Sequence, residues 1–404
     1  MSSTRTVQIP TEMWHNALEF ASPTALLKTI QVSKQLRDVS TMILYRSVTL
    51  HSPHSFISCL RTLSTNDNAA RSLRRLLIVC DIKHPGAALI RLAGVVFRRI
   101  APSLVHLELN IPMFDQVLST SHFSRLSSFT FRGSVTTNIA DFVNRHSHIL
   151  SSLSLHSTGI SQLQNEWLFR GDFQQLTTLT GTVDTVTDML FASLPRLESV
   201  DVSSAPTQSH SLTCFLTLLS CQSSQLTELI IRGDPGGLVT EFVAFRSPQI
   251  MYVVVHTLKR FEGLKTLRWL SPKSSDPYNF DRDLYIVTLF GVACPSLSSC
   301  ELTKSSWDRI TGKIWIPRSV DWREPSAPSA HDWLFHALYS EQYPLLDQLL
   351  DHLSALSSEA HSLVARYRKI QKGGTPEQKE KVVEDIMHLG QEFCLWNYEE
   401  LWPM

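Results

Sequence analysis

The stretch LVHLELN, residues 104–110, contains the pattern on which the fold prediction depends, Leu-x-x-apolar-x-apolar. The stretch LSSLSLH, residues 150–156, has the same pattern, and nine copies occur in all, with one lapse at Gly181 in the fifth copy. By their first and fourth residues the copies are Leu73/Leu76, Leu104/Leu107, Leu126/Phe129, Leu150/Leu153, Leu176/Leu179, Leu197/Val200, Leu226/Leu229, Leu264/Leu267 and Leu297/Cys300. This repetition predicts a repeat protein.

The distance between copies indicates the class of repeat. Successive copies start 21 to 38 residues apart, whereas leucine-rich repeats are about 20 to 29 residues long. The longer units therefore contain insertions. Segments between copies have helical spacing, for example Leu89, Leu92, Val96 and Ile100. We therefore expect an α/β fold, a leucine-rich-repeat solenoid with parallel strands on its concave face and helices outside.

Polar residues alternate with the apolar positions of each copy. The third, fifth and seventh positions are nearly all polar, as with Ser128, Thr130 and Arg132. Because successive side chains of a strand point to opposite faces, this alternation predicts one buried and one exposed sheet face. A flat polar face suits a protein or peptide partner better than a small molecule. We therefore expect the charged and hydrogen-bonding residues of this face to bind a protein substrate: His106, Glu108, Arg132, His156, Asp201, Glu228, Arg232, Arg268 and Glu301. The alternative for each residue is that it is only solvated surface.

Residues 1–50 precede the repeats and predict a module of three short helices. Pro10 and Thr11 can begin the first helix, and residues 22–24 separate it from the second. The module has more large apolar residues than so small a core can cover, so some should face a partner. The alternative is that they dock on the next domain of the same chain.

Particular residues of this module resemble the F-box signature in order and spacing. They are Ile9-Pro10-x-Glu12-Met13-Trp14, Leu26-Leu27, Val32-Ser33-Lys34, Arg37 and Leu44-Tyr45-Arg46-Ser47-Val48. Many F-box proteins continue into irregular leucine-rich repeats, as expected here. The sequence departs from the signature at Ala17, Ala21 and Gln31, where larger or apolar residues are usual. These departures imply that the module binds its partner protein more weakly than a typical F-box does.

In F-box proteins the three-helix module binds a Skp-type linker subunit, which in turn binds a cullin. The resemblance thus implies a substrate-recognition adaptor of a cullin-type ubiquitin ligase, with no catalytic residue of its own. It also implies these linker-binding residues: Ile9, Pro10, Met13, Trp14, Leu18, Phe20, Leu26, Leu27 and Val32. One alternative is a repeat scaffold without a ligase partner. Another, supported only by fold analogy, is a GTPase-activating protein that supplies Arg132 or Arg268.

The C-terminal region changes character near residue 320, so we expect domains at 1–50, 51–320 and 321–404. From His331 the apolar spacing is helical, with an interruption at Pro344. Thr375-Pro376-Glu377-Gln378 is a capping-box helix start. The final helix would seal the end of the repeat array, and a partner-binding helix is the alternative.

Composition excludes several classes of function. Thirty-seven Lys and Arg residues balance 37 Asp and Glu residues, so no global field favours nucleic acid or an anionic membrane. No signal peptide or membrane span is expected, and seven cysteines without a C-x-x-C pair fit a reducing compartment. We therefore expect a cytoplasmic or nuclear protein. Phosphate, dinucleotide and zinc-protease motifs do not occur, so no cofactor or metal is expected. His146 and His148 are expected to be solvated or on a strand face.

Overall fold

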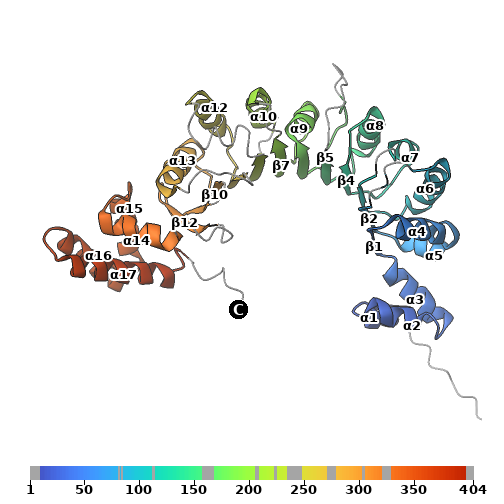
Figure 1. The fold of residues 1–404 in the computed structure, drawn as a ribbon, viewed down its shortest axis with the longest axis horizontal. Helices are drawn as coiled ribbons and strands as arrows, with labels where there is room; N and C mark the ends of the chain where they lie inside the picture. The colour runs from blue at the N-terminus through green and yellow to red at the C-terminus, as the bar shows by residue number, and fades with distance from the viewer. Residues whose placement is uncertain are drawn as a thin grey trace, which may run out of the picture. The chain divides into compact units, whose positions relative to one another are not determined.

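The computed structural model describes residues 10–80, 82, 85–111, 114–156, 168–204, 209–222, 225–233, 248–270, 279–302, 305–320 and 329–396. The chain divides into two compact units, Met1–Leu197 and Glu198–Met404. The fold is α/β, with a mostly parallel sheet whose strand order follows the chain (Figure 1).

The first unit contains a three-helix module followed by strands that alternate with helices. The module consists of α1 (Thr11–Leu18), α2 (Pro23–Thr29) and α3 (Lys34–Leu44). The strands are β1 (Ser47–Leu50), β2 (Arg75–Ile78), β3 (His106–Leu109), β4 (Ser128–Arg132), β5 (Ser152–His156) and β6 (Thr178–Thr182). The remaining helices are α4 (Pro53–Thr65), α5 (Asp67–Ser72), α6 (Ala87–Ile100), α7 (Asp115–Ser119), α8 (Thr137–His146) and α9 (Val183–Met189).

The second unit continues the alternation and ends in helices. Its strands are β7 (Ser199–Ser204), β8 (Glu228–Gly233), β9 (Thr266–Leu270), β10 (Ser299–Leu302), β11 (Ser305–Arg309) and β12 (Trp315–Val320). Its helices are α10 (Ser209–Gln222), α12 (Pro248–Leu258), α13 (Phe280–Ala293), α14 (Ala330–Ser340), α15 (Leu346–Leu356), α16 (Ser358–Gln371) and α17 (Pro376–Glu392).

The nine sequence copies correspond to nine strands, which confirms the repeat prediction. Each of β2 to β10 begins at the third residue of its copy. Within a unit these strands pair in parallel and in register, so that Leu107 lies opposite both Leu76 and Phe129. Right-handed crossovers through a helix are the usual way to connect such strands. Figure 1 shows the repeat helices along one side of the strands in each unit.

Burial alternates along the strands as the sequence predicts. In β5 and β6 the residues read half-buried, buried, half-buried, buried, half-buried. The apolar positions pack beneath the helices, and the polar positions form the face without helices, which we call the open face. Ile230 is an exception, because it is apolar, takes an open-face position in β8 and is buried.

Two parts of the sheet were not predicted. β1 pairs in parallel with β2, so residues 47–50 extend the sheet although the sequence placed them in the helical module. The sheet also continues beyond β10 as an antiparallel pair, β11 and β12. The turn between those two strands contains Gly312 at φ +52°, a conformation that glycine adopts without strain.

Aromatic rings form the centre of the first unit's core. Phe97 contacts Phe114 and Phe123, and Phe142 contacts Phe123 and Phe129, with centroid distances of 4.9 to 6.2 Å. These tilted and edge-on pairs add to the free energy gained by burying apolar area. The contacts connect α6 to the segments on either side of α7, and α8 to β4.

His146 lies within this core, so the expectation of a solvated or strand-face histidine was wrong. The residue is fully buried on α8. Its helical position, four residues after Phe142, directs the ring inward. His148 is exposed, as expected.

The C-terminal helices begin at the predicted signals, but the helix that packs on the last strand is not the final one, contrary to the expectation from the sequence. Thr375 caps α17 in a capping box with Gln378, and α15 begins two residues after Pro344. The contact with the sheet is made by α14, which packs on β12, while α17 packs on α14 and α16. Tyr343 Oη donates a 2.6 Å hydrogen bond to the backbone oxygen of Trp315, which fastens these helices to the last strand.

Candidate functional site

The three-helix module has a small core and a firm attachment to the first repeat. Leu26 and Val39 are buried where α2 and α3 meet, and the hydroxyls of Thr29 and Ser40 lie 2.6 Å apart in a hydrogen bond. Helix α3 packs on both α1 and α5. The module therefore has internal cohesion but little room to bury further side chains.

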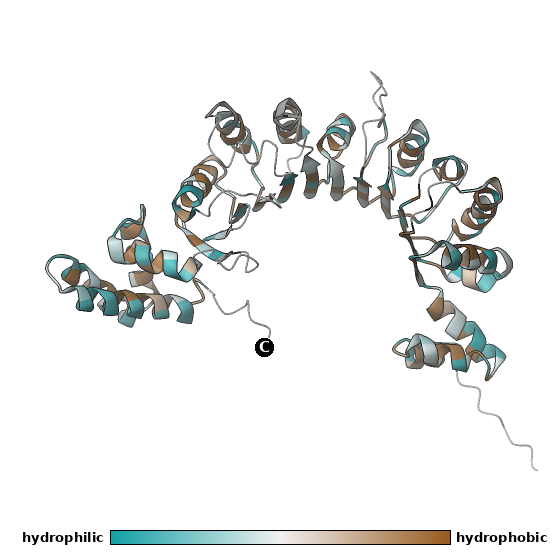
Figure 2. Cartoon of the chain, viewed as in Figure 1, coloured by the Kyte–Doolittle hydropathy of each residue, from teal (hydrophilic) through white to brown (hydrophobic). Residues whose placement is uncertain are grey.

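Large apolar side chains remain exposed on this module. Their exposed fractions are 61% for Met13, 92% for Phe20, 57% for Leu27 and 70% for Val32. Phe20 follows α1, Leu27 lies on α2, and Val32 precedes α3. Figure 2 shows hydrophobic segments on α1 and α2. We call these four side chains the exposed apolar set.

The other residues predicted to bind a linker differ in accessibility. Pro10 is exposed, and Trp14 and Leu18 are half-buried. Leu26 is only 3% exposed and belongs to the module's core. Ile9 lies outside the described residues. The structure thus distinguishes accessible from internal positions, which the sequence could not do.

The open face of the first unit brings the predicted residues into hydrogen-bonded pairs. Arg132 Nε donates to Glu108 Oε1 at 3.2 Å across β4 and β3. His106 Nδ1 lies 2.7 Å from Ser128 Oγ, and His156 Nε2 lies 2.9 Å from Ser154 Oγ. All four predicted residues therefore lie on one sheet face.

The open face of the second unit is organised by two arginine–carboxylate pairs. Arg232 donates two parallel hydrogen bonds to Asp201, at 2.8 and 2.9 Å, and the pKa of Arg232 is raised mainly by that bonding. Arg268 Nε donates to Glu301 Oε2 at 2.6 Å. The forked pair formed by Arg232 holds its guanidinium group in a fixed orientation.

Glu228 and Ile230 occupy the middle of the second unit's open face. Glu228 accepts a 3.0 Å hydrogen bond from Ser199 Oγ. Ile230 lies in register between Asp201 of β7 and Arg268 of β9. An apolar residue enclosed by charged neighbours was not predicted, although the sequence ELIIRG, residues 228–233, contains the signal: an apolar residue at a fifth position.

The arrangement presents fixed charges rather than reactive groups. Cys300 is fully buried and burial raises its pKa well above the ordinary value, so its thiol is poorly suited to nucleophilic chemistry. Arg132 and Arg268, the arginines considered for a GTPase-activating role, are each ion-paired with a neighbouring strand. A catalytic use of either arginine would first break its pair.

Neither a metal-binding cluster nor a membrane-spanning helix occurs in the described ranges. No group of three or more His, Cys, Asp or Glu side chains there is arranged to hold a metal ion. None of the helices in those ranges combines the length and hydropathy of a membrane span.

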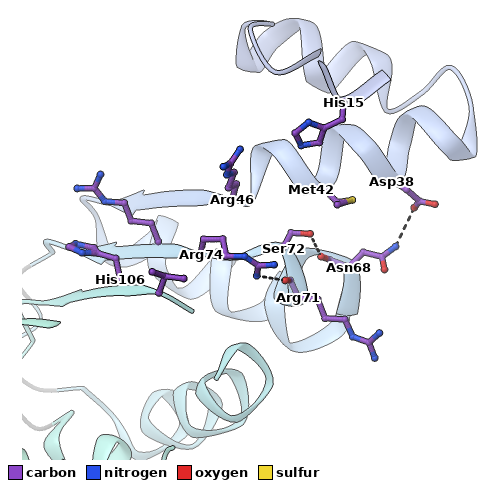
Figure 3. A pocket seen from close by; sticks show the side chains of 11 residues that line it. His15, Asp38, Met42, Arg46, Asn68, Arg71, Ser72, Arg74 and His106 are labelled. Carbon is purple, nitrogen blue, oxygen red and sulfur yellow. Dashed lines mark hydrogen bonds between the residues drawn. The ribbon is translucent and has the colours of Figure 1, made fainter. Parts of the chain in front are cut away.

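Sequence reasoning missed a pocket of about 900 Å³ in the first unit. Its walls come from α1, α3, α5 and the strands β2 and β3, and they include Arg46, Arg74, Arg75 and His106 (Figure 3). The lining residues are far apart in the sequence, from His15 to His106. Only the packing of the module on the first repeats brings them together.

Comparison with known proteins does not add a family to these observations. No protein-family model matches the chain, and no curated protein is significantly similar to it.

Proposed function

We propose that this protein is the substrate-binding subunit of a cullin-type ubiquitin ligase. In this proposal α1 to α3 form an F-box module for a Skp-type linker, and the repeats form a leucine-rich-repeat solenoid that holds a protein substrate. The observation that carries the proposal is the exposed apolar set on the three-helix module. The order of the segments, F-box-like residues followed by irregular repeats, supports it.

The exposed apolar set favours a partner protein on energetic grounds. Burying one large apolar side chain stabilises by about 1.5 to 3 kcal/mol. Phe20, with 92% of its surface exposed, gains none of this in the isolated chain. Four such side chains occur between residues 13 and 32, on or next to helices that are too short to cover them. A linker that covers them gains most of this free energy.

The open faces suit a protein substrate because they are polar, charged and already organised. The pairs Arg232–Asp201 and Arg268–Glu301 hold their charges in place before any partner arrives. Prior organisation reduces the entropy lost when a partner binds. The function is then positional, since holding the substrate near a ubiquitin-charged enzyme raises its effective concentration.

A repeat scaffold without a ligase partner is the competing function. The pairing of β1 with β2 and the packing of α3 on α5 would let α1 to α3 act as an end cap. A cap, however, is expected to present a polar outer surface. The exposure of Met13, Phe20, Leu27 and Val32 does not fit that expectation.

Linker capture by the full chain tests the proposal. We expect the single variants Phe20→Ala and Leu27→Ala each to weaken binding of a purified Skp-type linker at least about tenfold, because each removes buried apolar area from the complex. Tyr252→Ala is the matched control, since Tyr252 is also an exposed aromatic residue but lies on α12. These positions are better probes than Leu18, which is half-buried and would also affect folding.

Two results would contradict the proposal. One is failure of the folded wild-type chain to bind the linker at micromolar concentrations. The other is equal binding by wild type, Phe20→Ala and Leu27→Ala. Either result would favour the scaffold function.

A further inference from the structure

The pocket in the first unit joins the three-helix module to the repeats. Helix α1 contributes His15, and α3 contributes Asp38 and Met42, while Asn68 and His106 belong to the repeats. Figure 3 shows these side chains around one opening. Its volume of about 900 Å³ is within the range of ligand sites, about 300 to 1,000 Å³.

The charge of the pocket wall is predominantly positive. Arg46, Arg74 and Arg75 line it together with Arg71, whose side chain points away from Arg46 in Figure 3. Asp38 supplies the single carboxylate among the lining residues described. An anion placed in a pocket lined by several positive charges and one carboxylate is attracted to its wall.

Most of these positive charges are not neutralised by a carboxylate. Arg74 donates to the backbone oxygens of Arg71, at 2.7 Å, and Ser103, at 3.2 Å, which orient the guanidinium but leave its charge uncompensated. Arg75 has no ion-pair partner in the described part of the chain and is exposed. Arg46 pairs with Glu19 at 3.0 Å, and both side chains are largely exposed, so this pair is weak.

The polar groups of the wall also include unused hydrogen-bonding capacity. His106 Nδ1 bonds to Ser128 Oγ, whereas His106 Nε2 is buried and has no hydrogen-bond partner among the described residues. Asn68 donates to Asp38 at 3.2 Å, so that the one carboxylate is already engaged.

We propose that this pocket binds the phosphate group of an anionic ligand. Arginine is suited to this group because its planar guanidinium donates in pairs to phosphate oxygens. The pocket is larger than one phosphate, and the apolar side chains of Met42 and Val105 in its wall fit the less polar part of the same ligand. The source is either a free phosphorylated compound or a phosphorylated peptide segment. The site does not depend on the linker-binding role of the module.

Calorimetric titration of the full chain tests this site with two probes, inorganic pyrophosphate and the peptide Gly-Gly-phosphoserine-Gly-Gly. We expect saturable binding of at least one probe that weakens as salt is added, because the attraction is between charges. Arg75→Ala should weaken binding about tenfold or more, since a hydrogen bond to a charged group is lost. Met42→Glu should abolish binding by placing a negative charge in the pocket, and its exposed position makes it tolerable for folding.

The matched control is Arg91→Ala, because Arg91 is an exposed arginine of α6 outside the pocket. It should bind as wild type does. Tighter binding of the phosphopeptide than of pyrophosphate would identify a phosphorylated protein as the source, and the reverse order a free phosphorylated compound. Absence of saturable binding for both probes would overturn the proposal, as would unchanged binding in the folded Arg75→Ala and Met42→Glu variants.

Discussion

The backbone N–H of Phe123 donates a 2.9 Å hydrogen bond to Nε2 of His146 in the core of the first unit. The other ring nitrogen, Nδ1, lies 2.7 Å from the backbone oxygen of Phe142. Because Nε2 accepts, the proton of the neutral ring is on Nδ1, where it donates to that oxygen. One buried histidine thus satisfies a backbone donor and connects α8 to the loop before β4.

This geometry predicts that stability depends on His146 below neutral pH. The pKa of His146 is lowered from an ordinary value of 6.5 to about 4, mainly by burial and with contributions from His122, Arg145 and His148, against the opposing hydrogen bond to the Phe142 backbone oxygen. The unfolded chain therefore takes up a proton between pH 6.5 and 4 that the folded chain does not. As the pH falls through this window, the free energy of unfolding should decrease by about 1.4 kcal/mol per pH unit.

The variant His146→Phe should remove this pH dependence of the free energy of unfolding, but it should be less stable than wild type near neutral pH. Its Phe123 N–H is left without an acceptor, which should lower the free energy of unfolding by about 1 to 3 kcal/mol at pH 7.5. Urea unfolding at several pH values should give curves for wild type and variant that converge as the pH falls. His148→Ala is the control, since His148 is exposed. Parallel curves would show that His146 is not the titrating group.

Asp283 in the second unit predicts the opposite pH dependence. Its side chain accepts a 2.7 Å hydrogen bond from Ser305 Oγ, yet burial raises its pKa to about 6, with Ser305 and Arg282 opposing the rise. Between pH 4 and 6 the folded chain holds a proton that the unfolded chain has released. The free energy of unfolding therefore falls as the pH rises through this window, and the penalty is complete above it.

Asp283→Asn should consequently stabilise the protein at pH 8, by about 1 to 3 kcal/mol, because the amide needs no ionisation in a buried position. Urea unfolding at pH 8 and at pH 4 measures the difference, which should vanish at the lower pH. Glu262→Gln serves as the control, because Glu262 is exposed. Destabilisation of Asp283→Asn at pH 8 would mean that the contact with Arg282, 3.7 Å away, outweighs the cost of burial.

The sequence was sufficient to locate the nine strands because each copy combines a fixed spacing with an alternation of apolar and polar residues that has few exceptions. It missed β1 because Tyr45 takes the place of the first leucine, although Val48 and Leu50 keep the pattern. It missed the β11–β12 hairpin because antiparallel pairing depends on a turn at Gly312 and not on the repeat. Local pattern therefore predicts repeated elements better than terminal ones.

The candidate sites were predictable only in part. Strand periodicity placed Glu108 and Arg132 on the same face, but their pairing depends on the register between β3 and β4. The phosphate pocket could not be predicted, because Arg46 and His106 are brought together by tertiary packing alone. Nothing local in the sequence distinguished buried Leu26 from exposed Leu27, since adjacent positions on a helix differ only in the neighbours they meet.

Replacing Gly390 in α17 by alanine should change stability in the direction opposite to the one that helix propensity predicts. Alanine is intrinsically better than glycine in a helix by about 1 kcal/mol. A Cβ atom at residue 390, however, would overlap with the buried indole of Trp396, whose Nε1 donates to the Met387 backbone oxygen at 2.9 Å. Gly390→Ala should therefore destabilise by about 1 to 3 kcal/mol.

Thermal unfolding distinguishes this cause from a general effect of replacing glycine. Gly373→Ala is the control, because a Cβ atom there meets no other atom within 4 Å. The loss should also disappear when Gly390→Ala is made in a Trp396→Ala background, since the overlapping ring is then absent. A loss that persists in that background would exclude the contact with Trp396 as its cause.

For the ion pair of Arg132 and Glu108, we expect burial of the carboxylate to determine how much the pair contributes to the free energy of unfolding. The exposed fraction is 15% for the Glu108 side chain and 50% for Arg132, whereas Arg366 and Asp385 are exposed at 48% and 40%. Arg132→Ala leaves a largely desolvated carboxylate without its donor and should cost about 1 to 3 kcal/mol. Arg366→Ala should cost less than about 0.5 kcal/mol, with a smaller cost at high salt. Urea unfolding of both variants at two salt concentrations measures this, and equal costs would mean that burial does not control the pair.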